Sequence, residues 1–111
     1  MDCEFKEVFL LQKTSVFTQQ AKVILTDEDL ASVQIALVRD PYRGALIIGG
    51  GGLRKLRVGL ANKGKRGGAR VITCVVALNE SVTLLSIYDK AERANISDEE
   101  LKQMLKAADL L

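Results

Sequence analysis

Hydrophobic residues in the first third of the chain recur at the spacing of amphipathic helices. Thr14 or Ser15 can cap a first helix, and its apolar positions would be Val16, Phe17, Ala21, Ile24 and Leu25. Thr26 can cap a second helix, because three acidic residues follow it where the helix dipole favours anions. Pro41 ends the pattern, so we expect two helices within residues 14–39.

Most of the other apolar segments have the alternation or the β-branched content of strands. Residues 5–11 predict a first strand, and the alternation over residues 53–58 predicts another after the two helices. Residues 69–78 and 82–88 predict two more strands, joined by a turn at residues 79–81.

A last helix follows these strands. Ser97 and Glu100 have the spacing of a capping box, in which each side chain bonds to the other residue's backbone. The predicted order is therefore strand, helix, helix, three strands, helix. We expect an α+β fold in which a small, mostly antiparallel sheet packs against helices. At 111 residues with 48% hydrophobic content, the chain suits a single domain over residues 1–111.

Composition narrows the possible chemistry. The chain has no histidine, so catalysis of the Ser-His-Asp type is excluded, and its cysteines, Cys3 and Cys74, cannot by themselves form a zinc site. We expect reduced thiols, no metal and no cofactor. The chain lacks an apolar run of membrane-spanning length and a signal-peptide pattern at its start, so we expect a cytoplasmic protein without membrane contact.

Charge is distributed very unevenly. All nine glycines fall from Gly44 to Gly68, and from Pro41 to Asn79 there are eight basic residues and no acidic one. The eight are Arg43, Arg54, Lys55, Arg57, Lys63, Lys65, Arg66 and Arg70. Surface charge that serves only solubility normally mixes signs. The segment therefore predicts contact with phosphate groups.

Part of this segment resembles a phosphate-binding P-loop, from Gly59 to Lys65. Arg66 stands where that motif needs Ser or Thr to hold magnesium, and a strand rather than a helix follows, which argues against nucleotide hydrolysis. Glycines instead suit residues 63–68 to a hairpin tip. Either the tip is only solvated, or it binds nucleic acid through Lys63, Lys65 and Arg66; we favour binding, and we count Arg54 as a further RNA-binding residue.

A second group of cations lies within predicted strands. An extended segment puts Lys55 and Arg57 on one face and two apolar residues on the other. If the strand that carries Arg70 pairs with this one, the three side chains can gather around an anion. Register decides this, and the sequence does not fix register. Such a cluster costs stability unless an anion or an acidic partner compensates, which indicates a function.

The string GGLRKLRVGLANKGKRGGARVI, followed by LLSIYDKAER and a capped helix, resembles the RelE/HigB superfamily of bacterial type II toxins, nearest the HigB-like branch. The resemblance implies a ribosome-dependent endonuclease that cleaves translated mRNA. It also implies a cognate antitoxin, usually with a helix-turn-helix DNA-binding domain, through which the pair would contact operator DNA.

The resemblance also implies roles for particular residues. Lys55 and Arg57 match two basic residues of the family, Arg70 matches the arginine that opens the next strand, and Lys90 matches a Lys or Arg after the third strand. Tyrosines that relatives often carry are replaced here by Thr73 and Cys74, Ala91 stands where Asn is common, and no tyrosine follows Ile96. Tyr88 is then the nearby aromatic candidate.

These residues suggest attack by an RNA 2′-hydroxyl on the adjacent phosphate. Arg57 and Arg70 would bind the phosphate, because guanidinium groups match its oxygens. Lys55 is the candidate base, since neighbouring cations disfavour its protonated form, and Lys90 or Tyr88 would protonate the leaving oxygen. Two alternatives stay open, a non-catalytic RNA- or DNA-binding module and a subunit whose basic face meets only an acidic protein.

Overall fold

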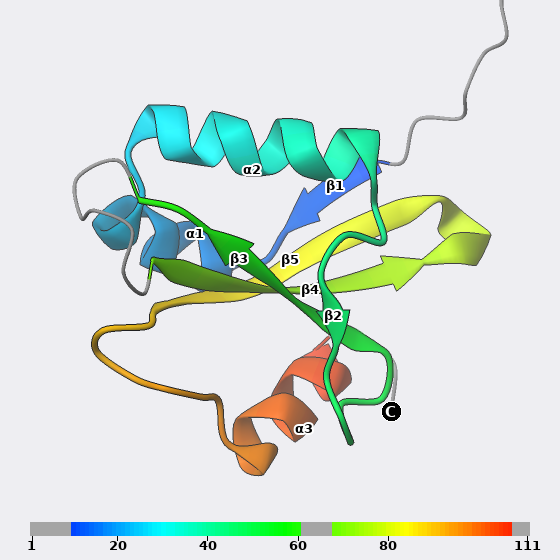
Figure 1. Cartoon of the computed structure of the whole chain (residues 1–111). Helices are drawn as coiled ribbons and strands as arrows, with labels where there is room; N and C mark the ends of the chain where they lie inside the picture. Colours follow the sequence, from blue (N-terminus) through cyan, green and yellow to red (C-terminus); the bar gives the residue numbers. More distant parts are fainter. Residues whose placement is uncertain (1–9, 61–67, 108–111) are drawn as a thin grey trace, which may run out of the picture.

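The computed structural model describes residues 10–60 and 68–107 (Figure 1). Their helices are α1 (Ser15–Ile24), α2 (Asp27–Arg39) and α3 (Asp98–Ala107). Their strands are β1 (Leu10–Lys13), β2 (Ala45–Leu46), β3 (Leu53–Val58), β4 (Ala69–Val76) and β5 (Ser81–Asp89). The strands form one sheet in the order β1-β5-β4-β3-β2. The predicted α+β class is confirmed.

The sheet is antiparallel except at one edge, where β1 runs parallel to β5. One strand, β2, was not predicted from the sequence. It has only two residues, too few to show an alternation, and it exists because Ala45 and Leu46 pair with Lys55 and Arg54 of β3. β4 also ends two residues before the predicted boundary, because residues 77–79 form a 3-10 turn.

The helices begin where the sequence indicates. The Thr14 hydroxyl accepts a hydrogen bond from the backbone N–H of Phe17, at 3.1 Å. Thr26 and Asp29 form a reciprocal capping box at the start of α2. Ser97 and Glu100 form another at α3, where the Glu100 N–H donates to the Ser97 hydroxyl at 3.2 Å. Each helix thus has its first backbone donors satisfied locally.

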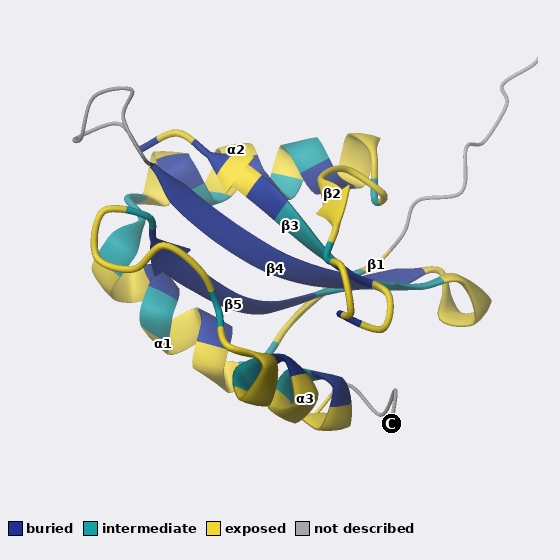
Figure 2. Ribbon diagram, turned by 60° about the horizontal axis from the view of Figure 1, so that its bottom comes forward, coloured by how far each residue is buried: buried dark blue, intermediate teal, exposed yellow. Residues whose placement is uncertain are grey.

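Helices cover both faces of the sheet, but unequally. α1 and α2 pack on one face through residues such as Phe17 and Leu37, which are fully buried. α3 packs on the other face, over the end of the sheet that carries Leu53 and Cys74 (Figure 1). Figure 2 shows the resulting burial, with β4 buried except at its last two residues and β2 exposed. The sheet face beyond α3 is left for the basic side chains of β3 and β4.

The pairing of β4 with β5, the strand that leads into the candidate site, contains a register shift. It falls between Ile72 and Thr73 of β4, and side chains of α1 and of its N-cap bond to the β5 backbone near this point. The Gln20 side-chain oxygen accepts from the backbone N–H of Ile87 at 2.9 Å, and the Thr14 hydroxyl donates to the carbonyl of Leu85 at 3.0 Å. Because buried backbone groups need partners, these bonds hold β5 in one register.

Candidate active site

Two strands bring cationic residues into one row, and a third strand adds a tyrosine to it. Arg57 of β3 lies directly opposite Arg70 of β4, and Arg70 lies opposite Tyr88 of β5. Lys55 lies two residues before Arg57, on the same face of β3. The sequence left the register open, and this pairing places two arginines side by side across a ladder.

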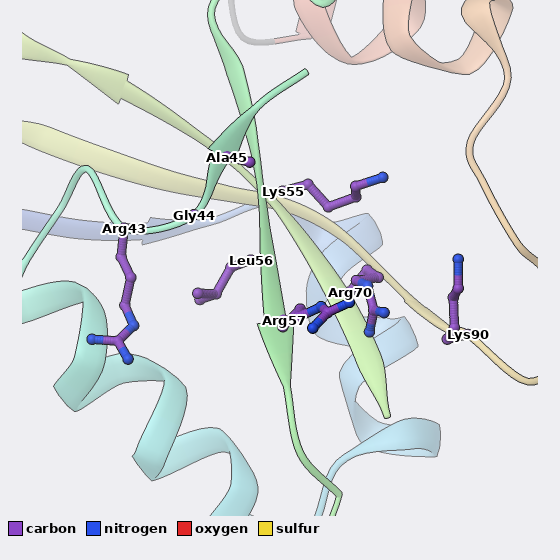
Figure 3. A pocket seen from close by; sticks show the side chains of 8 residues that line it. All are labelled: Arg43, Gly44, Ala45, Lys55, Leu56, Arg57, Arg70 and Lys90. Carbon is purple, nitrogen blue, oxygen red and sulfur yellow. The ribbon is translucent and has the colours of Figure 1, made fainter. Parts of the chain in front are cut away.

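A cavity of about 440 Å³ is open beside this row (Figure 3). Its lining residues are Arg43, Gly44, Ala45, Lys55, Leu56, Arg57, Arg70 and Lys90. Five of these carry positive charge, and none of the described residues that line the cavity is acidic. A positive electrostatic potential in a concave surface attracts anions.

The cationic side chains of the cavity differ in burial and in hydrogen bonding. Arg70 is only 9% exposed, and its Nη1 donates to the carbonyl of Ala69 at 3.2 Å, whereas Arg57 is exposed. Lys55 Nζ donates to the side-chain oxygen of Asn95 at 3.4 Å, and Lys90 Nζ donates to a backbone carbonyl, that of Ala94, at 2.9 Å. The two lysines therefore contact the segment between β5 and α3.

Tyr88 belongs to the row but does not line the cavity. It is 5% exposed and packs in the cluster beneath α3, and within the described residues its hydroxyl has no hydrogen-bond partner. Burial raises the pKa of Tyr88, while the charges of Arg70 and Arg93 act in the opposite direction. The Arg93 guanidinium lies 5.6 Å from the centre of the tyrosine ring.

Arg54, which the sequence predicts to bind RNA, holds a loop. Its Nη1 donates to the carbonyls of Tyr42 and Gly44, each at 3.0 Å, and its guanidinium lies 5.4 Å from the centre of the Tyr42 ring. It is not among the residues that line the cavity. Arg54 therefore fixes the connection between α2 and β2 onto β3.

Sequence reasoning did not place Arg43 in the site. Its position in the segment without acidic residues was the available signal, but Arg43 is distant in sequence from Lys55, and the sequence does not show that both line one cavity. Gly44 explains the placement: its φ is +101°, and a Cβ there would lie 2.7 Å from the carbonyl oxygen of Lys55. Only glycine allows the loop this approach to β3.

The other predicted tip residues, Lys63, Lys65 and Arg66, lie outside the described residues. Within the described ranges, no group of three or more His, Cys, Asp or Glu side chains is arranged to hold a metal ion. The helices of the described ranges are each too short or too polar to cross a membrane.

A family model described as the RelE toxin of the RelE/RelB toxin–antitoxin system matches residues 8–111. The chain belongs to the RelE toxin family. It is thus a toxin of a toxin–antitoxin system, and the family expected from the sequence is confirmed.

Solved structures of RelE toxins share the fold of this RelE family member. A free Escherichia coli RelE variant, in which two arginines are replaced by alanine, has a TM-score of 0.61 at 13% identity, covering 92% of this chain and 98% of that one. The RelBE2 toxin–antitoxin complex of Mycobacterium tuberculosis gives a TM-score of 0.53 at 18% identity, covering 76% of this chain and 93% of that chain. At these identities the likeness shows the fold alone.

Proposed function

We propose that this RelE family member is a ribosome-dependent mRNA endoribonuclease that inhibits translation. The observation that carries the proposal is the directly opposed pair Arg57 and Arg70 at a cavity where every charged residue of the described lining is cationic. Like charges placed opposite each other on a sheet destabilise it unless an anion lies between or beside them. An RNA phosphate is an anion that two guanidinium groups can bind.

Arg57 and Arg70 bind the phosphate in this proposal. Guanidinium groups donate paired hydrogen bonds to phosphate oxygens and stay charged at any working pH. Arg70 is buried and held in place, so it supplies a positioned donor, while the exposed Arg57 can follow the substrate. As the 2′-oxygen attacks, the phosphate gains negative charge, and the same donors stabilise that charge more strongly in the transition state.

The two lysines supply the proton transfers. Lys55 accepts the proton of the 2′-hydroxyl as its oxygen bonds to phosphorus, and Lys90 donates a proton to the 5′-oxygen as the bond from phosphorus to that oxygen breaks. The products are a 2′,3′-cyclic phosphate and a 5′-hydroxyl end. Both lysines line the cavity. No metal ion is needed in this scheme, because the guanidinium groups neutralise the charge.

Tyr88 is the second candidate for the proton donor. Its place opposite Arg70 brings it near the reacting phosphate, but its hydroxyl is buried and its pKa is raised by that burial. Lys90 lines the cavity and Tyr88 does not. We therefore assign the donor role to Lys90.

A cognate antitoxin is the proposed protein partner, and mRNA and the ribosome are the proposed targets. The fold neighbours include the complex of RelB with RelE from Escherichia coli and a RelBE2 complex, which supports an antitoxin that binds this fold. We propose an antitoxin of the helix-turn-helix type, which would provide the contact with operator DNA.

Cleavage of mRNA on programmed ribosomes tests the function. The wild type should yield fragments with 5′-hydroxyl ends, and Arg70→Ala should lower the rate constant for cleavage by at least about a hundredfold. Lys22→Ala, which removes a charge from α1 outside the cavity, should cleave normally. A wild type that binds ribosomes without producing new ends would instead be a non-catalytic binding module.

A further inference from the structure

The cavity does not end at the row of catalytic candidates. Figure 3 shows Lys55, Arg57, Arg70 and Lys90 on one side of β3, while Arg43 and Leu56 lie on the other. The cavity therefore passes around the outer edge of β3. It can do so because β2 pairs only with Arg54 and Lys55 of that edge, and no strand of the described residues pairs with the last three residues of β3 on this side.

A second hollow of about 160 Å³ continues from this edge, between β3 and α2. Arg43, Leu56 and Arg57 line both hollows, and Ser32, Val33, Ala36, Val58 and Gly59 complete the second. None of these described lining residues is acidic. A strand of RNA leaving the reacting phosphate thus has a continuous path over the β3 edge, with an apolar wall for a sugar or base and a cation for a phosphate.

Arg43 is positioned to be the cation that binds this phosphate. Within the described part of the chain, no hydrogen bond or ion pair occupies its guanidinium, although its backbone is tightly fixed: its N–H donates to the carbonyl of Asp40 at 3.1 Å. Arg54 holds the carbonyls on either side of it, at Tyr42 and Gly44. A loop anchored at three points that presents one unpaired arginine is a preorganised anion contact.

We infer that Arg43 forms a subsite for the RNA phosphate next to the scissile one, on its 5′ side. The inference rests on the proposed function, which fixes the direction of the strand. Lys90 protonates the leaving 5′-oxygen, so the 3′ part of the message lies on the Lys90 side. Arg43 lies across β3 from Lys90, so the nucleotide that carries the attacking hydroxyl extends its 5′ phosphate toward Arg43.

The experiment replaces single phosphates of the message by neutral methylphosphonates and measures kcat/KM for cleavage on programmed ribosomes. With the wild type, a neutral linkage on the 5′ side of the attacking nucleotide should lower kcat/KM about tenfold, the range expected for a charge-assisted contact. Arg43→Ala should lose about tenfold on natural mRNA, and the neutral linkage should then have no further effect.

Arg39→Ala is the matched control, because Arg39 is an exposed arginine at the end of α2 that lines neither hollow. With Arg39→Ala, the neutral linkage should still lower kcat/KM about tenfold, as it does with the wild type. If Arg43→Ala also keeps that penalty, or if the coupling appears at the phosphate on the 3′ side, the subsite is wrong while the endoribonuclease stands. A wild type that cleaves no message overturns the proposed function, and the subsite with it.

Discussion

Arg57 and Arg70 are direct cross-strand neighbours between β3 and β4, one exposed and the other 9% exposed. Opposite charges at such positions stabilise a sheet, and like charges destabilise it. We therefore expect an anion bound at this pair to stabilise the sheet, because it offsets the repulsion between the two guanidinium groups.

We predict that Arg57→Thr stabilises the protein while it abolishes cleavage. Threonine suits a strand and removes the repulsion, so the free energy of unfolding should rise by about 0.2–1 kcal/mol. Urea denaturation measures this change, and ribosomal cleavage measures the loss of activity. A variant that is less stable than the wild type would show that the Arg57 side chain makes net favourable contacts, and the repulsion argument would fail.

Sulfate should stabilise the wild type more than Arg57→Thr. A divalent oxyanion that binds only the folded state raises the midpoint of thermal unfolding by mass action, and its site needs both guanidinium groups. The measurement is the shift of Tm between chloride and sulfate at equal ionic strength. Arg39→Thr is the control, and it should show the wild-type shift, since Arg39 lies outside the cavity.

Gly44→Ala should destabilise the protein more than Gly49→Ala. Both glycines have positive φ, at +101° and +72°, so both substitutions carry a backbone cost of about 1–2 kcal/mol. Only at Gly44 does a Cβ also collide with the backbone of Lys55, whereas nothing lies within 4 Å of a Cβ at Gly49. Urea denaturation compares the free energies of unfolding of the two variants. Equal losses would mean that the loop before β2 moves to accommodate the Cβ at no cost in stability.

Tyr88→Phe should keep cleavage within a few-fold of the wild type, whereas Lys90→Met should lower the rate constant for cleavage by about a hundredfold or more. Removing the Tyr88 hydroxyl breaks no hydrogen bond among the described residues, so the stability of Tyr88→Phe should not fall. Single-turnover cleavage on ribosomes and urea denaturation give the two readouts. The reverse pattern of activities would assign the proton donor to Tyr88.

The contact between Arg93 and Glu100 predicts how stability depends on pH. Hydrogen bonds, chiefly from Arg93, lower the pKa of Glu100 from 4.5 to about 2. A carboxyl whose pKa is depressed by folding stabilises the folded state above its unfolded pKa, and this contribution disappears as pH falls from about 4.5 to about 2. Because the pair is partly exposed, we expect less than about 1 kcal/mol.

Glu100→Gln is the variant that checks this dependence, since glutamine can still complete the capping box with Ser97. Its free energy of unfolding should be lower than that of the wild type near neutral pH, and the difference should vanish near pH 2. A difference that stays constant across that range would place the effect in helix capping rather than in the charge of Glu100.

Much of the site could be anticipated from local sequence, and some of it could not. Lys55 and Arg57 fall on the basic face of β3 as the alternation predicts, because side-chain direction in a strand depends only on its own residues. The role of Arg54 in the loop was not accessible in this way. Its partners, Tyr42 and Gly44, lie in the connection that leads to the two-residue strand β2, and such a segment leaves no periodic signal.

The sequence by itself determined the helices with their caps, the strands of the β3–β5 meander, the segment without acidic residues and the family. These depend on interactions between near neighbours in the chain or on residue type. Only the tertiary structure decided that Arg57 lies opposite Arg70, that Tyr88 is buried, and that Gly44 brings Arg43 to the edge of β3. Strand register and loop contact join residues far apart in the chain, and the packing of the whole sheet selects among pairings that are locally equivalent.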